Sequence, residues 1–279
     1  MPLVRQPRDV LRPFVQQLWA SDPSDAPPGA PSGSGREAVL PSVSTQLVIR
    51  LAEQPLRVFR HRDDLEGYAV STAVIGGPRL APYLKDVSRP VPTVGAALRP
   101  GVAGLLIGAP AGTFVGRHLP LEDVWGAAPV AVLRAALWEA GSAAQRLAIF
   151  EAALVVRLPK VTGLDPLVAQ ALAGFDAGAP VGAVVTESGY SHRTFTRRFA
   201  AAVGLKPKTY ARLQRFGRAL DPLAKGAAAA GAAPSLADLA AWHGYADQAH
   251  FVREFRQFSG LTPGCYRRLA PAFARHVAL

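Results

Sequence analysis

Two patterns of hydrophobic residues divide the chain. In roughly the first hundred residues, short apolar runs rich in Val, Ile, Phe and Tyr alternate with Gly and Pro, which is typical of strands joined by turns. These runs occupy residues 44–51, 55–60, 68–77 and 91–100. Beyond them, residues 102–110 and 130–158 carry Ala and Leu at helical spacing, and the second stretch predicts two helices that break near Gly141. The patterns together predict an α+β protein that begins with a small β-sandwich or barrel.

Three segments interrupt these patterns. Residues 22–35 are rich in Pro, Gly and Ser and predict a flexible loop. Residues 159–166 predict the joint between two domains, residues 1–158 and residues 160–279. The first domain is expected to be β-rich to about residue 118 and helical after it, and the second to be helical. The Ala/Gly-rich residues 224–234 either extend the preceding helix or form a linker, and their composition leaves both open.

An internal repeat occupies the second domain. Phe251 lies 56 positions after Phe195, and seven further residue types recur at the same offset. The residues of the second copy that match the residue type 56 positions earlier are Phe251, Arg253, Phe255, Gly260, Leu261, Pro263, Tyr266 and Arg268. A repeat this dense indicates two copies of one structural unit.

The first copy has the signals of two helices joined by a short turn. A short helix is predicted over residues 181–188, a turn at residues 189–190, and a longer helix from about Ser191, which is a good N-cap. Gly204 suits the end of that helix and Pro207 the start of the next. Two helices at an angle across a short turn that contains Gly form a helix-turn-helix.

The longer helix of this copy is predicted to have two opposite faces. Phe195 and Phe199 lie four residues apart and would anchor the helix to the core. Arg193 and Arg197 are displaced by two residues, about 200° around the helix, with Thr196 between them on the exposed side. Because Arg can donate two hydrogen bonds to guanine in the major groove, this face is expected to read DNA bases.

The second copy repeats this arrangement. Residues 235–244 predict a short helix with Ser235 as N-cap and Asp238 in the capping-box position, and a second reading helix follows from about Asp247. Its expected base-reading residues are Gln248, Ala249, Val252 and Arg253. Arg253 matches Arg197, Gln248 could bind adenine, and the two apolar residues could contact a thymine methyl group.

The segment between the copies, residues 206–225, predicts an amphipathic helix that holds them together. Its apolar stripe is formed by Tyr210, Leu213, Phe216 and Leu220, which leaves Arg212, Arg215 and Arg218 for a solvated face. Four residues near the starts of helices are expected to contact DNA phosphates: Ser191, His192, Lys206 and Lys208. Two reading helices fixed in one chain would recognise a bipartite site in double-stranded DNA, with halves about one helical turn apart.

Charge supports this interpretation. The chain holds 31 Lys and Arg against 20 Asp and Glu, a formal charge of +11. Residues 160–279 contribute 15 basic and 7 acidic residues, or +8, so the excess lies mainly in the part with the repeat. Such asymmetry favours a polyanionic partner, of which nucleic acid is the commonest.

These residues resemble a known family. The run GYADQAHFVREFRQFSGLTPGCYRR is similar to the second helix-turn-helix signature of AraC/XylS bacterial transcription regulators, and RTFTRRF with GLKPKTY is similar to the weaker first unit. One departure is Ala249, where the signature usually has Ser. The resemblance implies base contacts by the outward positions named above, and an N-terminal sensor domain, often a cupin-like barrel, that responds to a small-molecule effector. It also implies a possible homodimer and, for an activator, contact with RNA polymerase.

Other chemistries find less support in the sequence. His61 and His118 lack the His-x-His spacing of a metal cupin, and neither a metal nor a cofactor is expected. Cys265 invites comparison with Ada-like repair enzymes that use such repeats for docking, but one half-buried thiol is expected, and catalysis is not. A non-specific architectural DNA binder remains the third alternative. The aromatic residues proposed for an effector pocket are Phe14, Trp19, Tyr83 and Trp125. No apolar run reaches the length of a membrane helix and no secretory signal opens the chain, so a cytoplasmic protein is expected.

Overall fold

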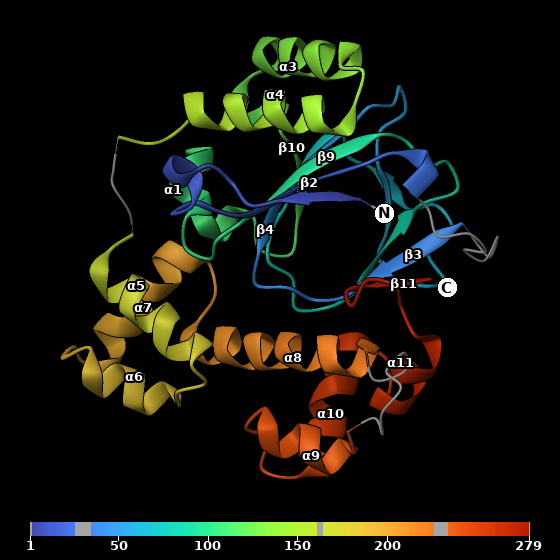
Figure 1. The fold of residues 1–279 in the computed structure, drawn as a ribbon. Coiled ribbons are helices and arrows are strands. Elements are labelled where there is room, and N and C mark those ends of the chain that lie inside the picture. Colours follow the sequence, from blue (N-terminus) through green and yellow to red (C-terminus); the bar gives the residue numbers. More distant parts are fainter. Residues whose placement is uncertain (1, 26–34, 161–163, 226–233, 279) are drawn as a thin grey trace.

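The computed structural model describes residues 2–25, 35–160, 164–225 and 234–278 (Figure 1). The loop predicted over residues 22–35, the joint over 159–166 and the Ala/Gly-rich segment 224–234 lie partly outside these described residues. Within them, two antiparallel sheets and the helices that follow form the N-terminal part, and the rest of the chain is mainly helical. The expected α+β class, with a β-rich N-terminal region and a helical C-terminal region, is confirmed.

The first sheet has six strands in the order β1-β2-β9-β4-β7-β10, and all its pairings are antiparallel. Burial alternates along its central strand, where Thr45, Leu47 and Ile49 point into the core, because successive side chains of a strand face opposite sides. The strands are β1 (Leu3–Arg5), β2 (Val15–Ser21), β4 (Thr45–Arg50), β7 (Ala73–Gly76), β9 (Thr93–Leu98) and β10 (His118–Pro120).

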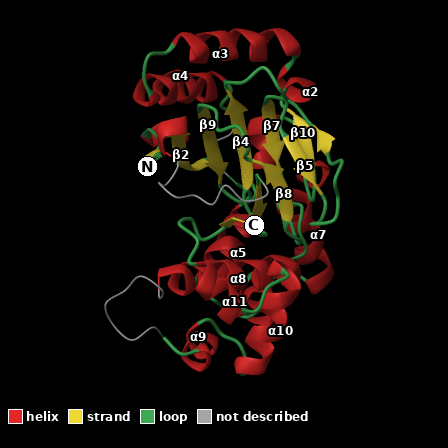
Figure 2. Ribbon diagram, turned by 90° about the vertical axis from the view of Figure 1, so that its right-hand side faces the viewer, coloured by secondary structure: helices red, strands yellow, loops and turns green. Residues whose placement is uncertain are grey.

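Helices cover one face of this sheet. Figure 2 shows α3 (Ala127–Glu139) and α4 (Ala143–Val156) above it, and α4 packs on β2 and β9. The two helices break at residues 140–142, where Ser142 caps α4 by accepting a hydrogen bond from Gln145 N, so the predicted break near Gly141 is confirmed. Two short helices, α1 (Ala103–Ile107) and α2 (Glu122–Trp125), and the 3-10 turns η1 (Asp9–Leu11), η2 (Pro23–Asp25) and η3 (Ala111–Thr113) complete this part.

The second sheet has five strands in the order β11-β3-β8-β5-β6. Its strands are β3 (Arg36–Val39), β5 (Arg57–Phe59), β6 (Tyr68–Ala69), β8 (Tyr83–Asp86) and β11 (His276–Ala278). Residues 68–77, which the pattern suggests as one strand, divide between β6 of this sheet and β7 of the other. The chain crosses from one sheet to the other at Ser71 and Thr72, which lie between these two strands. Val58 and Val74, one from each sheet, meet in a small buried cluster.

The C-terminal part contains helices α5 to α11, which lie below the sheets in Figure 1. Their hydrophobic core continues into the five-stranded sheet, since Ala38, Phe59 and Leu84 belong to the same buried cluster as the helical residues. Strand β11, near the C-terminus, pairs with β3 and buries Val277 completely. The division into residues 1–158 and 160–279 stays a prediction, but the last strand of the second range is part of a sheet of the first.

Candidate nucleic-acid interface

The first helix-turn-helix forms where the sequence predicts it. Helix α6 (Val181–Glu187) is followed by a turn and by α7 (His192–Val203). The Ser191 hydroxyl caps α7 by accepting a hydrogen bond from Thr194 N at 3.3 Å. The helix ends at Gly204, whose φ of 82° is the left-handed conformation that Gly adopts at little cost.

Helix α7 has the two faces expected of a reading helix, with one exception. Phe195 and Phe199 are fully buried and stack with ring centroids 6.0 Å apart, whereas Arg193 and Arg197 are exposed. Thr196 departs from the expectation, because it is only half-exposed and its hydroxyl oxygen is enclosed without a hydrogen-bond partner. The hydroxyl of Thr196 is therefore not accessible on the exposed face of the helix. The two arginines are the fully accessible side chains of this predicted set.

The second helix-turn-helix consists of α9 (Leu236–Trp242) and α10 (Gln248–Ser259). Ser235 and Asp238 form the predicted capping box at the start of α9. Asp247 caps α10 by accepting a hydrogen bond from His250 N at 2.6 Å, and the helix ends at Gly260 with φ 74°. The second unit thus repeats the local structure of the first.

Helix α10 also presents its predicted face to solvent. Phe251 and Phe255 are fully buried on one side. The four predicted base-reading residues lie on the other side, with Gln248, Ala249 and Arg253 exposed and Val252 half-exposed. The half-exposed side chain of Val252 suits the apolar contact with a thymine methyl group that the sequence predicts.

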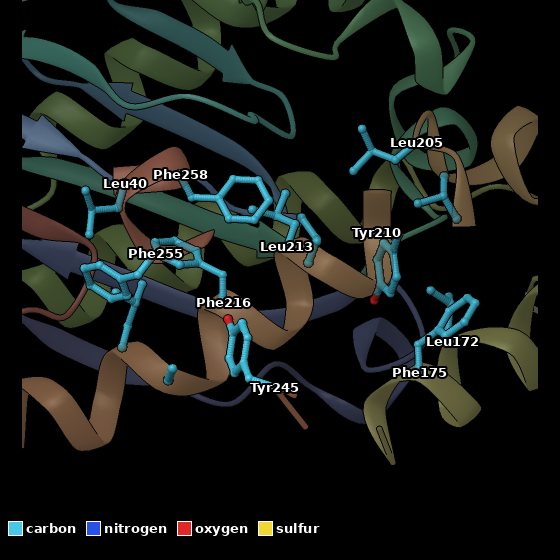
Figure 3. Packing of buried hydrophobic residues seen from close by; sticks show 14 of the residues in the cluster. Leu40, Leu172, Phe175, Leu205, Tyr210, Leu213, Phe216, Tyr245, Phe255 and Phe258 are labelled. Atoms are coloured by element: carbon cyan, nitrogen blue, oxygen red, sulfur yellow. The ribbon is translucent and has the colours of Figure 1, made fainter. Parts of the chain in front are cut away.

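Helix α8 (Pro207–Lys225) joins the two units. Its predicted stripe, Tyr210, Leu213, Phe216 and Leu220, is buried. Figure 3 shows Tyr210 beside Phe175 of α5 (Pro166–Asp176) and Phe216 near Phe255 of α10. Ring centroids of these pairs are 5.8 and 5.3 Å apart. Because one helix supplies core residues to both units, it couples the placement of α7 to that of α10.

Three arginines of α8 do not lie on a purely solvated face. Arg212 and Arg215 both pair with Glu254 of α10, at Nε–Oε2 2.6 Å and Nη2–Oε1 2.9 Å. Arg218 donates to the carbonyl oxygens of Phe175 and Asp176 at the end of α5. These side chains therefore hold α8 against both units. Lys206 and Lys208, by contrast, are exposed to solvent.

Glu254 was missed by the pattern, although a signal was present. It lies on the helical stripe formed by Phe251, Phe255 and Phe258, and only 3% of its side chain is exposed. An acidic residue at a core position of an amphipathic helix predicts a buried ion pair, because a buried charge needs a partner. Which basic residue would meet it depends on the tertiary fold.

The predicted phosphate contacts share one property. Ser191 and His192 at the start of α7, and Lys206 and Lys208 at the start of α8, are all exposed. The Ser191 hydroxyl is also occupied by its own helix, since it bonds both the backbone and the Oγ1 of Thr194. An exposed helix start with basic neighbours suits an anionic ligand such as a phosphate.

The four aromatic residues proposed for an effector pocket do not share one cavity. Phe14 is buried in the core beneath the first sheet, and Trp19 of β2 packs against Gly95 of β9. Trp125 of α2 lies under the guanidinium of Arg157, 4.2 Å from its ring. Tyr83 of β8 lines a surface cavity of about 320 Å³. The shared pocket stays a prediction, because the sequence pattern carries no information on which side of each sheet these rings lie.

Two negative observations concern the described residues alone. Among residues 2–25, 35–160, 164–225 and 234–278, no group of three His, Cys, Asp or Glu side chains is arranged to hold a metal ion. In the same part of the chain, no helix combines the length and apolar character of a membrane span. Cys265 is a free, half-buried thiol in the first turn of α11 (Pro263–Leu269), as expected.

Family comparison divides the chain in two. Residues 184–269 match a family described as a helix-turn-helix domain, and residues 4–120 match a domain of unknown function, DUF6597. The first match covers α7 to α11 and all seven predicted base-reading residues. The second covers the two sheets apart from β1's first residue and β11. A comparison with curated proteins finds no match.

Solved structures offer distant similarities. ToxT from Vibrio cholerae shares 8% identity over 96% of this chain and 98% of its own, with a TM-score of 0.46. A second ToxT structure, bound to (E)-4-(8-methylnaphthalen-1-yl)but-3-enoic acid, shares 10% identity over 84% and 95%, with a TM-score of 0.45. The xylose-binding transcription activator XylR shares 22% over 39% and 28%, with a TM-score of 0.31. From its family matches, the chain carries a helix-turn-helix domain of the AraC type that follows a DUF6597 domain, which supports a DNA-binding transcription regulator.

Proposed function

We propose that one chain reads two successive major grooves of DNA, one with α7 and one with α10. The observation that carries this proposal is the matched geometry of the two helices. Each is anchored by two fully buried phenylalanines and exposes an arginine at the same position of the repeat, Arg197 or Arg253. An exposed arginine on a groove-sized helix can donate two hydrogen bonds to a guanine.

The two helices differ in what they would recognise. Arg193 and Arg197 give α7 two cationic side chains, which favour guanine. Gln248 with Ala249 and Val252 gives α10 an amide and two small apolar groups, which favour adenine and the thymine methyl group. The proposed operator is therefore asymmetric, with a G-containing half and a half that combines G with A·T pairs.

Phosphate contacts would fix the position of the protein on the duplex. Lys206 and Lys208 stand next to the end of α7, and Ser191 and His192 at its start. Contacts of this kind supply affinity that falls with salt but little sequence preference. They are proposed mainly for the first unit.

The N-terminal domain is proposed to modulate this binding in response to a small molecule. The structural support is a direct contact between η3 of that domain and α7. A change at η3 would alter the placement of one reading helix relative to the other, and with it the spacing of half-sites that one chain can bind. Homodimer formation and contact with RNA polymerase remain expectations of the family.

Selection of bound fragments from random duplex DNA with the full chain tests the proposal. We expect a bipartite motif with half-sites about 10 base pairs apart, the spacing of major grooves on one face of DNA. The same selection with Phe199→Asp, which removes a buried anchor of α7, is the control. DNA fragments recovered by the parent and not by this variant are bound through a correctly held α7. Recovery of no motif, or of a single uninterrupted motif bound by one unit, would contradict the proposal.

A further inference from the structure

A cavity of about 320 Å³ lies at the edge of the five-stranded sheet nearest the first helix-turn-helix. Its walls are largely apolar and aromatic and include Phe59, Tyr68, Leu80, Tyr83 and Val115. Two arginines, Arg60 and Arg79, also line it. An apolar cavity with a few polar groups is the usual form of a small-molecule site, and this volume suits a small ligand.

Arg79 brings an uncompensated positive charge to this cavity. Its Nη2 donates to Nδ1 of His118 at 2.6 Å, and its guanidinium lies 4.5 Å from the centre of the Tyr83 ring. Its Nε is enclosed without a hydrogen-bond partner. In the described part of the chain, no carboxylate lies within ion-pair distance of this side chain, unlike Arg146, which pairs with Asp22.

The neighbours of Arg79 do not neutralise it. Burial, and then the charge of Arg79, lowers the pKa of His118 to about 3, so its imidazole is neutral at neutral pH and accepts the hydrogen bond. Burial raises the pKa of Tyr83 to about 12, so its phenol stays protonated. The nearest acid on the adjoining strand, Glu37, already pairs with Lys85 and His276. Arg79, His118 and Tyr83 together therefore carry one net positive charge beside an apolar wall, and Arg60, which also lines the cavity, adds a second.

We propose that this cavity binds a small carboxylic acid with an apolar body. The carboxylate would pair with Arg79, which is the geometry that a guanidinium favours. The protonated Tyr83 hydroxyl can donate a further hydrogen bond, and Tyr68 and Leu80 would pack against the apolar part. An anion here supplies the partner that the half-buried charge lacks.

The cavity also touches the first reading helix through one residue. Val115 lines the cavity, and it packs against the core of the helical part. A Cβ built on Gly204, the C-cap of α7, would lie 2.9 Å from Val115 Cγ2, so the two segments are in close contact. This coupling rests on the proposed function. A ligand that moves Val115 would change the affinity of the protein for DNA, and DNA would change the affinity for the ligand by the same factor.

Calorimetric titration of the full chain with hexanoate and cyclohexanecarboxylate tests the site. The uncharged hexanamide and cyclohexanecarboxamide serve as matched probes of similar shape. We expect the acids to bind saturably at one site. The amides are expected to bind at least about tenfold more weakly, which is the usual effect of losing a charge-assisted hydrogen bond. Equal affinity for acid and amide, or no binding of either acid, would overturn the proposal.

Two variants locate the site. Arg79→Gln is expected to weaken acid binding about tenfold or more, whereas Arg89→Gln, at an exposed arginine outside the cavity, leaves it unchanged. Ala81→Trp fills the entrance from an exposed position without removing a buried group, and it is expected to weaken acids and amides alike. Acid binding that survives both Arg79→Gln and Ala81→Trp would place the ligand elsewhere.

DNA binding is measured separately with the selected operator. An acid that binds the cavity without changing the DNA dissociation constant would overturn the coupling through Val115. Failure to select any operator would contradict the proposed function, while the titration result for the cavity would stand on its own.

Discussion

The two helix-turn-helix units have the same local structure but different supports. Both reading helices begin at a capping side chain and end at a left-handed Gly. At Gly204 of the first unit, an added Cβ would lie 2.9 Å from the carbonyl oxygen of Ala111 in the N-terminal domain, whereas at Gly260 it would meet nothing within 4 Å. The end of α7 therefore contacts the N-terminal part of the chain, and the end of α10 does not.

The position equivalent to Arg198 in the repeat is Glu254, and the two residues carry opposite charges. Arg198 of α7 pairs with Asp165, the N-cap of α5, at Nη2–Oδ2 2.6 Å. Glu254 of α10 pairs instead with Arg212 and Arg215 of α8. The second reading helix is thus fixed to the helix that joins the units, and the first to the helix that precedes it. The two copies therefore share the buried phenylalanines and one exposed arginine, but they differ in the ion pairs that hold each helix in place.

Among the residues that differ between the two units, Glu254 is expected to matter most for stability. We expect Glu254→Gln to lower the free energy of unfolding by about 2–4 kcal/mol, because two half-buried guanidinium groups lose their carboxylate. Arg198→Gln is expected to cost clearly less, because the side chain of its partner Asp165 is 32% exposed whereas that of Glu254 is 3% exposed. Urea denaturation of both variants measures the difference. Equal losses would contradict the view that the second unit depends more on its ion pairs.

Gly204 and Gly260, which end α7 and α10, allow a second comparison of the stability of the two units. We expect Gly260→Ala to cost about 1–2 kcal/mol, the price of placing alanine in a left-handed conformation. Gly204→Ala is expected to cost more, because its Cβ also meets the backbone of Ala111. Thermal unfolding measures both, and operator affinity is expected to change further in Gly204→Ala than in Gly260→Ala at matched stability. A smaller cost at Gly204 would argue against a tight contact between α7 and η3.

The pH dependence of stability reports on the strand that follows the second unit. His276 of β11 pairs with Glu37, whose pKa falls to about 2 because the hydrogen bond from His276 and the charge of Lys85 outweigh the effect of burial. Burial, and then the charge of Lys85, lowers the pKa of His276. A lowered folded pKa means that the unfolded chain takes up the proton first, so this stability is complete above the ordinary histidine pKa and is lost as pH falls below it.

Replacing His276 should therefore reduce the loss of the free energy of unfolding as the pH falls. We expect the free energy of unfolding of His276→Asn to fall less steeply below about pH 6.5 than that of the parent, by at most about 1.4 kcal/mol per pH unit. His192→Asn, at an exposed histidine of the first unit, is the matched control. Urea midpoints across pH measure this. An unchanged slope in His276→Asn would contradict the assignment.

The smallest expected effect concerns salt. Lys206 of the first unit stands where the second has Thr262. If Lys206 contacts one phosphate, Lys206→Thr reduces the slope of log affinity against log salt by about 0.9, with sequence preference retained. Fluorescence anisotropy at several salt concentrations measures the slope. A changed sequence preference at constant slope would make Lys206 a base-reading residue instead.

Local signals in the sequence predicted most of the helical part. Ser191, Ser235 and Asp238 are capping residues whose bonds are made within one turn, and Gly204 and Gly260 end their helices by backbone conformation alone. Such features depend on neighbours along the chain. The amphipathic stripe of α8 was predictable for the same reason, because its 3/3/4 spacing sets which side is buried.

Features that depend on distant residues were out of reach. The pattern could not show that β11 joins β3, since a three-residue strand carries little signal and its partner lies more than two hundred positions away. It could not show that Glu254 meets Arg212 and Arg215, or that Thr196 turns its hydroxyl inward. The strand run 68–77 divides between two sheets because pairing, not propensity, decides the sheet to which a strand belongs.

We propose that α7 and α10 each recognise one half of a single DNA site. This proposal is tested most directly by repeating the selection from random duplex DNA with Arg197→Ala and with Arg253→Ala. Each substitution removes one exposed arginine and leaves the buried anchors and ion pairs in place. We predict that Arg197→Ala loses sequence information in one half-site only and Arg253→Ala in the other half-site only. Loss of the same half in both variants, or an unchanged motif in both, would contradict the account.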